Sequence, residues 1–144
     1  MVKANITLLD TGTLVAALYT DHPQHAWANA QLDRAEQGQP CLSTHTLAEV
    51  YKVLTGHPHI RMAPGDALQL MDGLLQNYRR IPLTEADYHA ALSRCASQNL
   101  SGSVLFDALI AQAALSAGAG ALVTLNPRDF RRLGEDVSAL VVSP

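Results

Sequence analysis

The sequence predicts an α/β protein, a three-layer doubly wound sandwich around a short parallel β-sheet. Short apolar segments alternate with helical patterns along the whole chain, and these segments lack the polar alternation of a half-solvated strand. Strands that are apolar on both faces must be covered by helices on both faces. In such folds the functional crevice lies beyond the carboxyl ends of the strands.

Helix boundaries follow from capping residues and breakers. Ser43 or Thr44 can cap a helix that ends at Gly56, because their side-chain oxygens accept hydrogen bonds from free backbone amides. Pro64 suits the first turn of the next helix, and Thr84 can cap the one after it. Helices are expected at residues 13–19, 24–36, 44–56, 64–78, 85–98, 104–117 and 127–133.

The expected strands are short runs of apolar residues bounded by glycine and proline. Gly38 and Pro40 end one helix before a strand, and Gly118 and Gly120 end another. Strands are expected at residues 6–9, 41–42, 80–83, 121–124 and 139–142. No repeat or linker divides the chain, so residues 1–144 are expected to form a single domain.

Composition narrows the class of protein. No stretch stays apolar for the ~18 residues that a membrane helix needs, and Asp10 interrupts the N-terminal apolar segment that could otherwise be a signal peptide. Cys41 and Cys95 show neither zinc-ligand nor redox spacing, so a cytoplasmic location is expected. The net charge of −3 argues against an indiscriminate nucleic-acid binder, which usually carries a basic excess.

Two aspartates stand alone in apolar surroundings. Asp10 follows the first expected strand and is the only charged residue between Lys3 and Asp21, while Asp107 lies in the first turn of the most apolar helix. A carboxylate in low dielectric is costly unless a cation, hydrogen bonds or solvent stabilise it. Asp10 could instead shape a turn, and Asp107 could be stabilised by free amides at its helix start. Together, in this fold, they favour a site.

Three weaker candidates accompany these two aspartates. Glu49 lies off the apolar stripe of its helix and could be an ordinary solvated side chain. Asn126 and Asp129 follow the fourth expected strand and could simply cap a short helix. Several acidic groups in one crevice suit a hard cation such as Mg²⁺, which takes oxygen ligands and activates water for phosphodiester hydrolysis.

Four segments in this order resemble the PIN domain family, in its VapC-like toxin branch. They are Asp10-Thr11 after the first strand, Glu49 in Leu47-Ala48-Glu49-Val50, Phe106-Asp107-Ala108-Leu109-Ile110-Ala111, and Thr124-Leu125-Asn126-Pro127-Arg128-Asp129-Phe130. The resemblance covers almost the entire chain. It implies a metal-dependent endoribonuclease that acts as the toxin of a type II toxin–antitoxin system. It also implies a homodimer and a cognate antitoxin protein that covers the groove.

The resemblance also implies roles for individual residues. Asp10 and Asp107 would ligate Mg²⁺ or Mn²⁺, Glu49 would hold or orient a metal-bound water, and Asn126 or Asp129 would complete the pocket beside Thr11. The chain departs from the family pattern at Gly12, where a small polar residue is commoner, and at Asn126, which is an aspartate in many members. Whether one or two ions bind stays open. Arginines near the pocket are placed to meet the phosphates of the RNA substrate, namely Arg128, Arg131 and Arg132.

Two other functions fit parts of the sequence. The segment from Asp10 to Leu14 resembles the nucleophile loop of haloacid-dehalogenase-like phosphatases, which need a second aspartate where Gly12 stands and a lysine that is absent after Lys52. A non-catalytic PIN-fold binding module is the second alternative. The full acidic set argues against it, although Asn126 keeps it open.

Overall fold

The computed structural model describes residues 5–144 of the chain and contains a parallel sheet in the order β3-β2-β1-β4-β5. In the three middle strands of the sheet, Leu8 of β1 lies opposite Cys41 of β2 on one side and Leu122 of β4 on the other. The order reverses direction between β1 and β4, which is the topological switch point of a doubly wound sheet. The strands are β1 (Ile6–Leu9), β2 (Gln39–Ser43), β3 (Arg79–Ile81), β4 (Ala121–Val123) and β5 (Val141–Val142).

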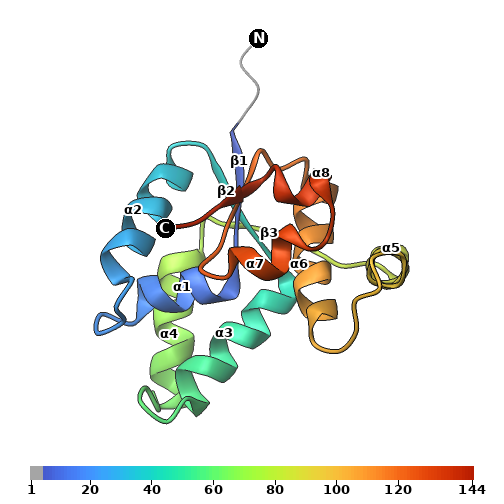
Figure 1. Cartoon of the computed structure of the whole chain (residues 1–144). Coiled ribbons are helices and arrows are strands. Elements are labelled where there is room, and N and C mark those ends of the chain that lie inside the picture. The colour runs from blue at the N-terminus through green and yellow to red at the C-terminus, as the bar shows by residue number, and fades with distance from the viewer. Residues whose placement is uncertain (1–4) are drawn as a thin grey trace.

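Helices cover both faces of the sheet, so the predicted three-layer architecture is confirmed (Figure 1). The first four helices pack with one face, and they are α1 (Thr11–Leu18), α2 (His25–Glu36), α3 (Thr44–Gly56) and α4 (Pro64–Leu75). The last four pack with the other face, and they are α5 (Glu85–Ser97), α6 (Val104–Ala117), α7 (Pro127–Arg131) and α8 (Glu135–Ser138). None of the helices in residues 5–144 has the length and apolar character of a membrane span.

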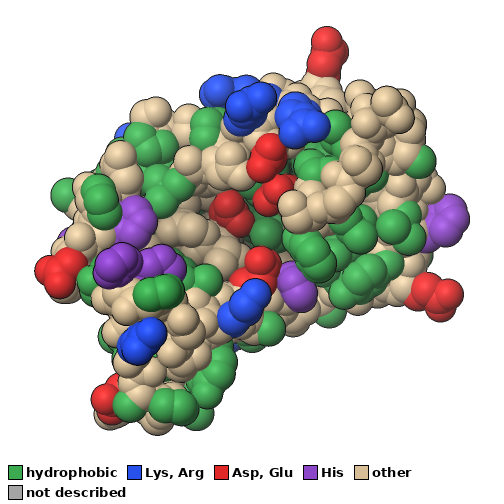
Figure 2. Space-filling view, turned by 60° about the horizontal axis from the view of Figure 1, so that its bottom comes forward, with side chains coloured by type: hydrophobic (Ala, Val, Ile, Leu, Met, Phe, Trp, Pro, Cys, Tyr) green, Lys and Arg blue, Asp and Glu red, His purple; other side chains and the backbone are tan. Residues whose placement is uncertain are grey.

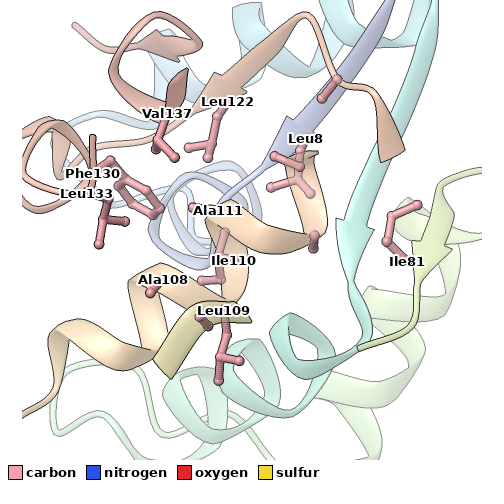
Figure 3. Close-up of a cluster of buried hydrophobic side chains, with 14 of the residues drawn as sticks. Leu8, Ile81, Ala108, Leu109, Ile110, Ala111, Leu122, Phe130, Leu133 and Val137 are labelled. Carbon is pink, nitrogen blue, oxygen red and sulfur yellow. The ribbon is translucent and has the colours of Figure 1, made fainter. Parts of the chain in front are cut away.

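Successive side chains along each strand point to opposite faces of the sheet and so contribute to two separate hydrophobic cores. Leu8 points into the cluster under α6, whereas its neighbour Leu9 belongs to the cluster under α1 and α3. Figure 3 shows the first cluster, in which Phe130 and Val137 gather beside Leu122. Each fully buried leucine or phenylalanine contributes roughly 1.5–3 kcal/mol. The core therefore holds both faces of a sheet whose strands are only a few residues long.

Two element boundaries differ from the sequence prediction near the crevice. Helix α1 begins at Thr11, two residues earlier than expected, because Asp10 caps it immediately after β1. Strand β2 begins at Gln39 and includes Pro40, which the sequence placed outside the strand. Pairing with β3 starts only at Cys41, so the missing N–H of the proline interrupts no pairing on that side.

Several other boundaries differ by a few residues: β3 covers 79–81 rather than 80–83, α7 ends at 131 rather than 133, and β5 covers 141–142 rather than 139–142. Helix α4 ends at Leu75 rather than at 78, and Tyr78 turns inward, where its hydroxyl donates to the Glu36 carboxylate at 2.8 Å. Helix α8 was not expected, because four residues are too few to show a periodicity. By contrast, α6 has the predicted ends, closed by Gly118 in the left-handed conformation.

Candidate functional site

Asp10 is a buried carboxylate at the carboxyl end of the central strand, with 7 % of its surface exposed. Its Oδ1 accepts a hydrogen bond from the Thr11 amide at 2.7 Å, and its Oδ2 accepts one from the Thr124 hydroxyl at 2.8 Å. Burial raises the pKa of Asp10 to about 6, against these two hydrogen bonds, and the nearby Glu49 charge raises it further. The capping role is therefore present, but it does not offset the burial of the charge.

Asp107 lies in the first turn of α6 and is half-buried. Burial raises its pKa to about 7, and the charges of Asp10, Asp129 and Glu49 raise it in that order of importance. Among the hydrogen bonds of residues 5–144, none reaches the Asp107 carboxylate, so no free helix amide pairs with it directly. Four acidic groups from distant parts of the chain thus influence one another in a single crevice.

Glu49 faces the crevice from α3 rather than lying on a fully solvated surface. Its Oε1 accepts a hydrogen bond from the Thr11 hydroxyl at 3.3 Å, across from the start of α1. The Nε2 atom of His45, one helical turn earlier, lies 3.7 Å from the same oxygen. The Thr11 hydroxyl therefore orients the carboxylate and links it to the segment that carries Asp10, while His45 lies beside it.

The segment after β4 supplies the opposite wall. The Thr124 hydroxyl oxygen accepts a hydrogen bond from the Asn126 backbone N–H at 2.9 Å. The Asn126 side-chain amide donates to Asp129 Oδ2 at 2.8 Å. Arg132 lies 3.4 Å from the other Asp129 oxygen and partly neutralises it. Asn126 therefore positions Asp129 instead of adding a charge.

The arginines on this wall differ in their contacts. Arg128 and Arg131 are exposed and make no ion pair among the contacts of residues 5–144, in contrast to Arg132. Figure 2 shows Asp and Glu side chains around a hollow on one face, with Lys and Arg side chains on its rim. This arrangement can hold a cation at the centre and phosphates around it.

The chemistry of the crevice fits a hard divalent cation. Asp10 and Asp107 form no ion pair with Lys or Arg within the described part of the chain; burial raises the pKa of both, and the Glu49 charge adds to the rise in each. The available donors are carboxylate and hydroxyl oxygens, which Mg²⁺ and Mn²⁺ prefer. As they stand, no three acidic, histidine or cysteine side chains in residues 5–144 are close enough to form a complete metal cluster. Waters and substrate phosphates would have to complete the coordination.

Two features of the site were not predicted from the sequence. Thr124 holds the buried Asp10 carboxylate, and its signal in the sequence is a hydroxyl residue at the end of an apolar strand. The rings of His45 and Phe106 stack with centroids 5.9 Å apart and 9° between their planes. Residues so far apart in sequence show no pairing until the fold is known.

The family model of the PIN domain matches residues 7–136, which is most of the chain. The chain belongs to the PIN domain family. The match includes all four acidic residues of the crevice, Asp10, Glu49, Asp107 and Asp129. None of the curated proteins matches the sequence.

Solved structures share this PIN fold at low sequence identity. The VapBC2 complex of Rickettsia felis, bound to a DNA fragment from its promoter, has 22% identity and a TM-score of 0.70, covering 96% of this chain and 98% of that chain. VapC20 of Mycobacterium tuberculosis, a toxin that cleaves the sarcin-ricin loop, has 17% identity and a TM-score of 0.65, with 81% and 86% covered. FitAcB of Neisseria gonorrhoeae has 20% identity and a TM-score of 0.68, with 94% and 95% covered.

Proposed function

We propose that this PIN domain is a metal-dependent endoribonuclease that acts as the toxin of a toxin–antitoxin pair. The observation that carries the proposal is the convergence of Asp10, Glu49, Asp107 and Asp129 at the carboxyl ends of β1 and β4. Within residues 5–144, Asp10 and Asp107 form no ion pair with a cationic side chain, and burial and neighbouring carboxylates disfavour their charged forms. A crevice that concentrates carboxylates and is bordered by arginines suits a cation and a phosphodiester.

Each residue has a distinct part in the proposed reaction. Asp10 and Asp107 hold Mg²⁺ or Mn²⁺, and Thr124 fixes the orientation of Asp10 through its hydroxyl. When bound, the ion would lower the pKa of a coordinated water and stabilise negative charge on the phosphate. Glu49 orients the attacking water, whose oxygen bonds to phosphorus while the bond to the leaving sugar oxygen breaks. Asp129, held by Asn126, completes the acidic wall.

RNA is the proposed substrate, and the rim arginines are its proposed phosphate contacts. Among the described residues Arg128 and Arg131 form no ion pair, so their guanidinium groups can bind phosphate oxygens, whereas Arg132 contacts Asp129. VapC20, a solved toxin with the same fold, is described as cleaving the sarcin-ricin loop. We infer that the present chain acts on cellular RNA in the cytoplasm, with its target chosen by groove shape.

The proposed protein partners are a cognate antitoxin and a second copy of this chain. Several solved structures with this fold are toxin–antitoxin complexes, including VapBC of Salmonella typhimurium bound to DNA and a complex from Klebsiella pneumoniae. An antitoxin that covers the acidic crevice would block access of RNA to the carboxylates. A homodimer would present two such crevices. The phosphatase alternative is not carried forward, because the PIN model matches most of the chain.

The proposal is tested by cleavage of total cellular RNA with purified protein in Mg²⁺, in Mn²⁺ and in excess chelator. We expect discrete fragments that require the metal and disappear in Asp10→Ala and Asp107→Ala. The matched control is Asp136→Ala, which removes an aspartate outside the crevice and should cut like the wild type. Circular dichroism should first confirm that both crevice variants are folded, so that a loss of cleavage is not caused by unfolding.

Two results would contradict the nuclease. If folded wild-type protein free of antitoxin cut no RNA, the chain would be a non-catalytic binding module with the PIN fold. If Asp10→Ala and Asp107→Ala cut as fast as wild type, any observed cleavage would come from elsewhere.

A further inference from the structure

A small pocket beside the carboxylates has features of a nucleotide-binding subsite. It has a volume of about 280 Å³ and is lined by His45, Ala48, Glu49 and Lys52 of α3 and by Phe106 of α6. Phe106 immediately precedes Asp107, and Glu49 belongs to the crevice itself, so the pocket and the crevice share a wall. A strand of RNA with a phosphate among the carboxylates would have a neighbouring nucleotide at this position.

Phe106 is exposed in a helix that is otherwise mostly buried. It keeps 48 % of its surface accessible, whereas Ala108, Leu109 and Ile110 are almost completely buried. Leaving a large apolar ring in water forfeits the stabilisation that its burial would supply, which makes an exposed ring next to a polar crevice informative. An aromatic face at such a place is typical of a surface on which a base stacks.

The ring of Phe106 already has a stacked neighbour. His45 lies parallel to it, with 9° between the planes and centroids 5.9 Å apart, in the offset geometry that aromatic rings prefer. The Nε2 atom of His45 lies 3.7 Å from a Glu49 oxygen, so the ring also borders the crevice. The two stacked rings form an aromatic platform that a third ring, such as a nucleobase, can extend.

The charge of the pocket suits a nucleotide rather than an apolar side chain. His45, Glu49 and Lys52 are spaced four and three residues apart, so they lie on one face of α3. Lys52 is one of only two lysines in the sequence, and among the ion pairs of residues 5–144 it has no carboxylate partner. An ammonium group at the rim of an otherwise acidic crevice can bind a phosphate that the carboxylates would repel.

We propose that an unpaired RNA nucleotide next to the scissile phosphate binds in this pocket, with its base stacked on Phe106 and its phosphate at Lys52. The inference rests on the proposed ribonuclease function and adds a recognition site to it. Stacking tolerates every base, so the pocket selects an unstacked loop nucleotide over a nucleotide held in a duplex.

The test compares two probes of equal charge, fluorescein-labelled hexauridine and an abasic ribose–phosphate hexamer, binding in excess chelator so that neither is cut. We expect the wild type to bind hexauridine about tenfold more tightly than the abasic strand, and Phe106→Leu to remove most of that difference. Phe106→Tyr keeps the ring and should keep the difference. Lys52→Gln should weaken both probes equally, because it contacts phosphate.

The control is Leu92→Ala, a change on α5 at a side chain that is 51 % exposed and lies outside the pocket. It should bind both probes like the wild type. If Phe106→Leu keeps the full preference for hexauridine, the proposal is overturned. The same holds if Phe106→Leu impairs binding of the antitoxin but not of RNA, since the ring would then belong to a protein interface.

Cleavage of total RNA by the same wild-type preparation separates this proposal from the ribonuclease function. If the protein cleaves RNA with metal but Phe106→Leu keeps the preference for hexauridine, the subsite is overturned and the nuclease function stands. Absence of cleavage with Phe106-dependent binding would overturn the nuclease and support the subsite as part of an RNA-binding module.

Discussion

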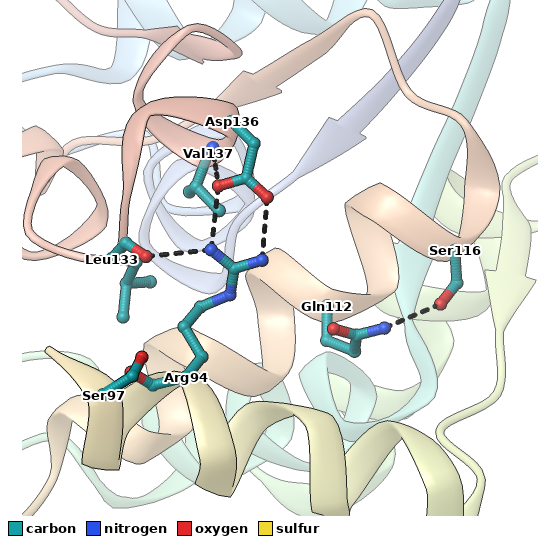
Figure 4. Close-up of polar contacts among 7 residues, drawn as sticks. All are labelled: Arg94, Ser97, Gln112, Ser116, Leu133, Asp136 and Val137. Atoms are coloured by element: carbon teal, nitrogen blue, oxygen red, sulfur yellow. Dashed lines mark hydrogen bonds and ion pairs between the residues drawn. The ribbon is translucent and has the colours of Figure 1, made fainter.

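The electrostatic surroundings of Asp136 are opposite to those of the crevice aspartates, Asp10 and Asp107. Asp136 pairs with Arg94, whose two terminal nitrogens donate to its two oxygens at 2.8 Å each, and Figure 4 shows the same guanidinium reaching the Leu133 carbonyl. The Arg94 hydrogen bonds lower the pKa of Asp136. Within residues 5–144, Asp10 and Asp107 have no such cationic partner, and burial raises the pKa of both.

The Asp136 carboxylate stabilises the fold through its ion pair, whereas the fold disfavours the charged forms of Asp10 and Asp107 by burying them. The ion pair of Asp136 ties α8 to α5 and is satisfied within the chain. Asp10 and Asp107 have no ion pair among the described residues, and carboxylates with a pKa raised in a crevice mark a candidate functional site. Four predictions test this distinction, from the largest expected effect to the smallest.

Thr124→Val should slow RNA cleavage by roughly 10- to 100-fold, the usual effect of removing a group that orients a metal ligand. The variant loses the hydroxyl that donates to Asp10 at 2.8 Å and leaves that oxygen unpaired in a buried position. Initial rates in Mg²⁺ measure the effect. Thr124→Ser retains the hydroxyl and should stay near the wild-type rate; a fast Thr124→Val enzyme would show that Asp10 needs no positioning.

Asp107→Asn should raise the free energy of unfolding at pH 8 by roughly 1–2 kcal/mol in excess chelator, after allowance for solvent screening. The wild type loses stability as pH rises from the ordinary aspartate value through about 7, because the folded protein must release a proton that it holds more tightly than the unfolded chain. The asparagine variant has no such loss.

Urea unfolding at pH 4, 6 and 8 checks this prediction. The difference between variant and wild type should be small at pH 4 and largest at pH 8. A variant less stable than wild type at pH 8 would mean that Asp107 is already neutralised within the fold.

Mg²⁺ or Mn²⁺ should stabilise the wild type by about 1.4 kcal/mol at ten times its dissociation constant. The effect should weaken as pH falls through about 7 and then about 6, because protons compete with the cation for Asp107 and Asp10. Thermal unfolding with and without metal measures it. Asp136→Asn should respond to metal like wild type, whereas an equal response from Asp107→Asn would place the ion elsewhere.

Arg94→Gln should lower the free energy of unfolding by about 0.5–1 kcal/mol at neutral pH, since it breaks a two-point ion pair near the surface. The loss should shrink at low pH. The pKa of Asp136 is lowered in the folded protein, so its contribution is present above the ordinary aspartate value and disappears as pH falls through the folded one. Cleavage should not change, and a slower enzyme would connect this ion pair to the crevice.

Much of the architecture was predictable because the strands are apolar on both faces and the helices carry strong end signals. The ends of α6 and the Thr84 cap of α5 were predicted correctly. The start of β2 was missed because Pro40 reads as a breaker when the edge of the pairing is unknown. The extent of a single domain over residues 1–144 stays a prediction.

The carboxylates were predicted with less uniform support. Asp10 and Asp107 were identifiable because each is isolated among apolar residues. Glu49 had no such signal, since a glutamate on an amphipathic helix usually faces solvent, and only its resemblance to the family pattern suggested a role. Their catalytic and metal-binding roles remain predictions until the variants are measured.

The sequence by itself determined the layered α/β class, the PIN resemblance and the two costly aspartates, because these depend on local periodicity and on charge within a segment. Only the tertiary structure decided that Thr124 would hold Asp10, that Asn126 would position Asp129, and that His45 would stack on Phe106. The two long-range contacts join separate segments, and even the short Asn126 contact depends on the backbone turn after β4. The direction of a side chain in such contacts follows from how helices pack on the sheet.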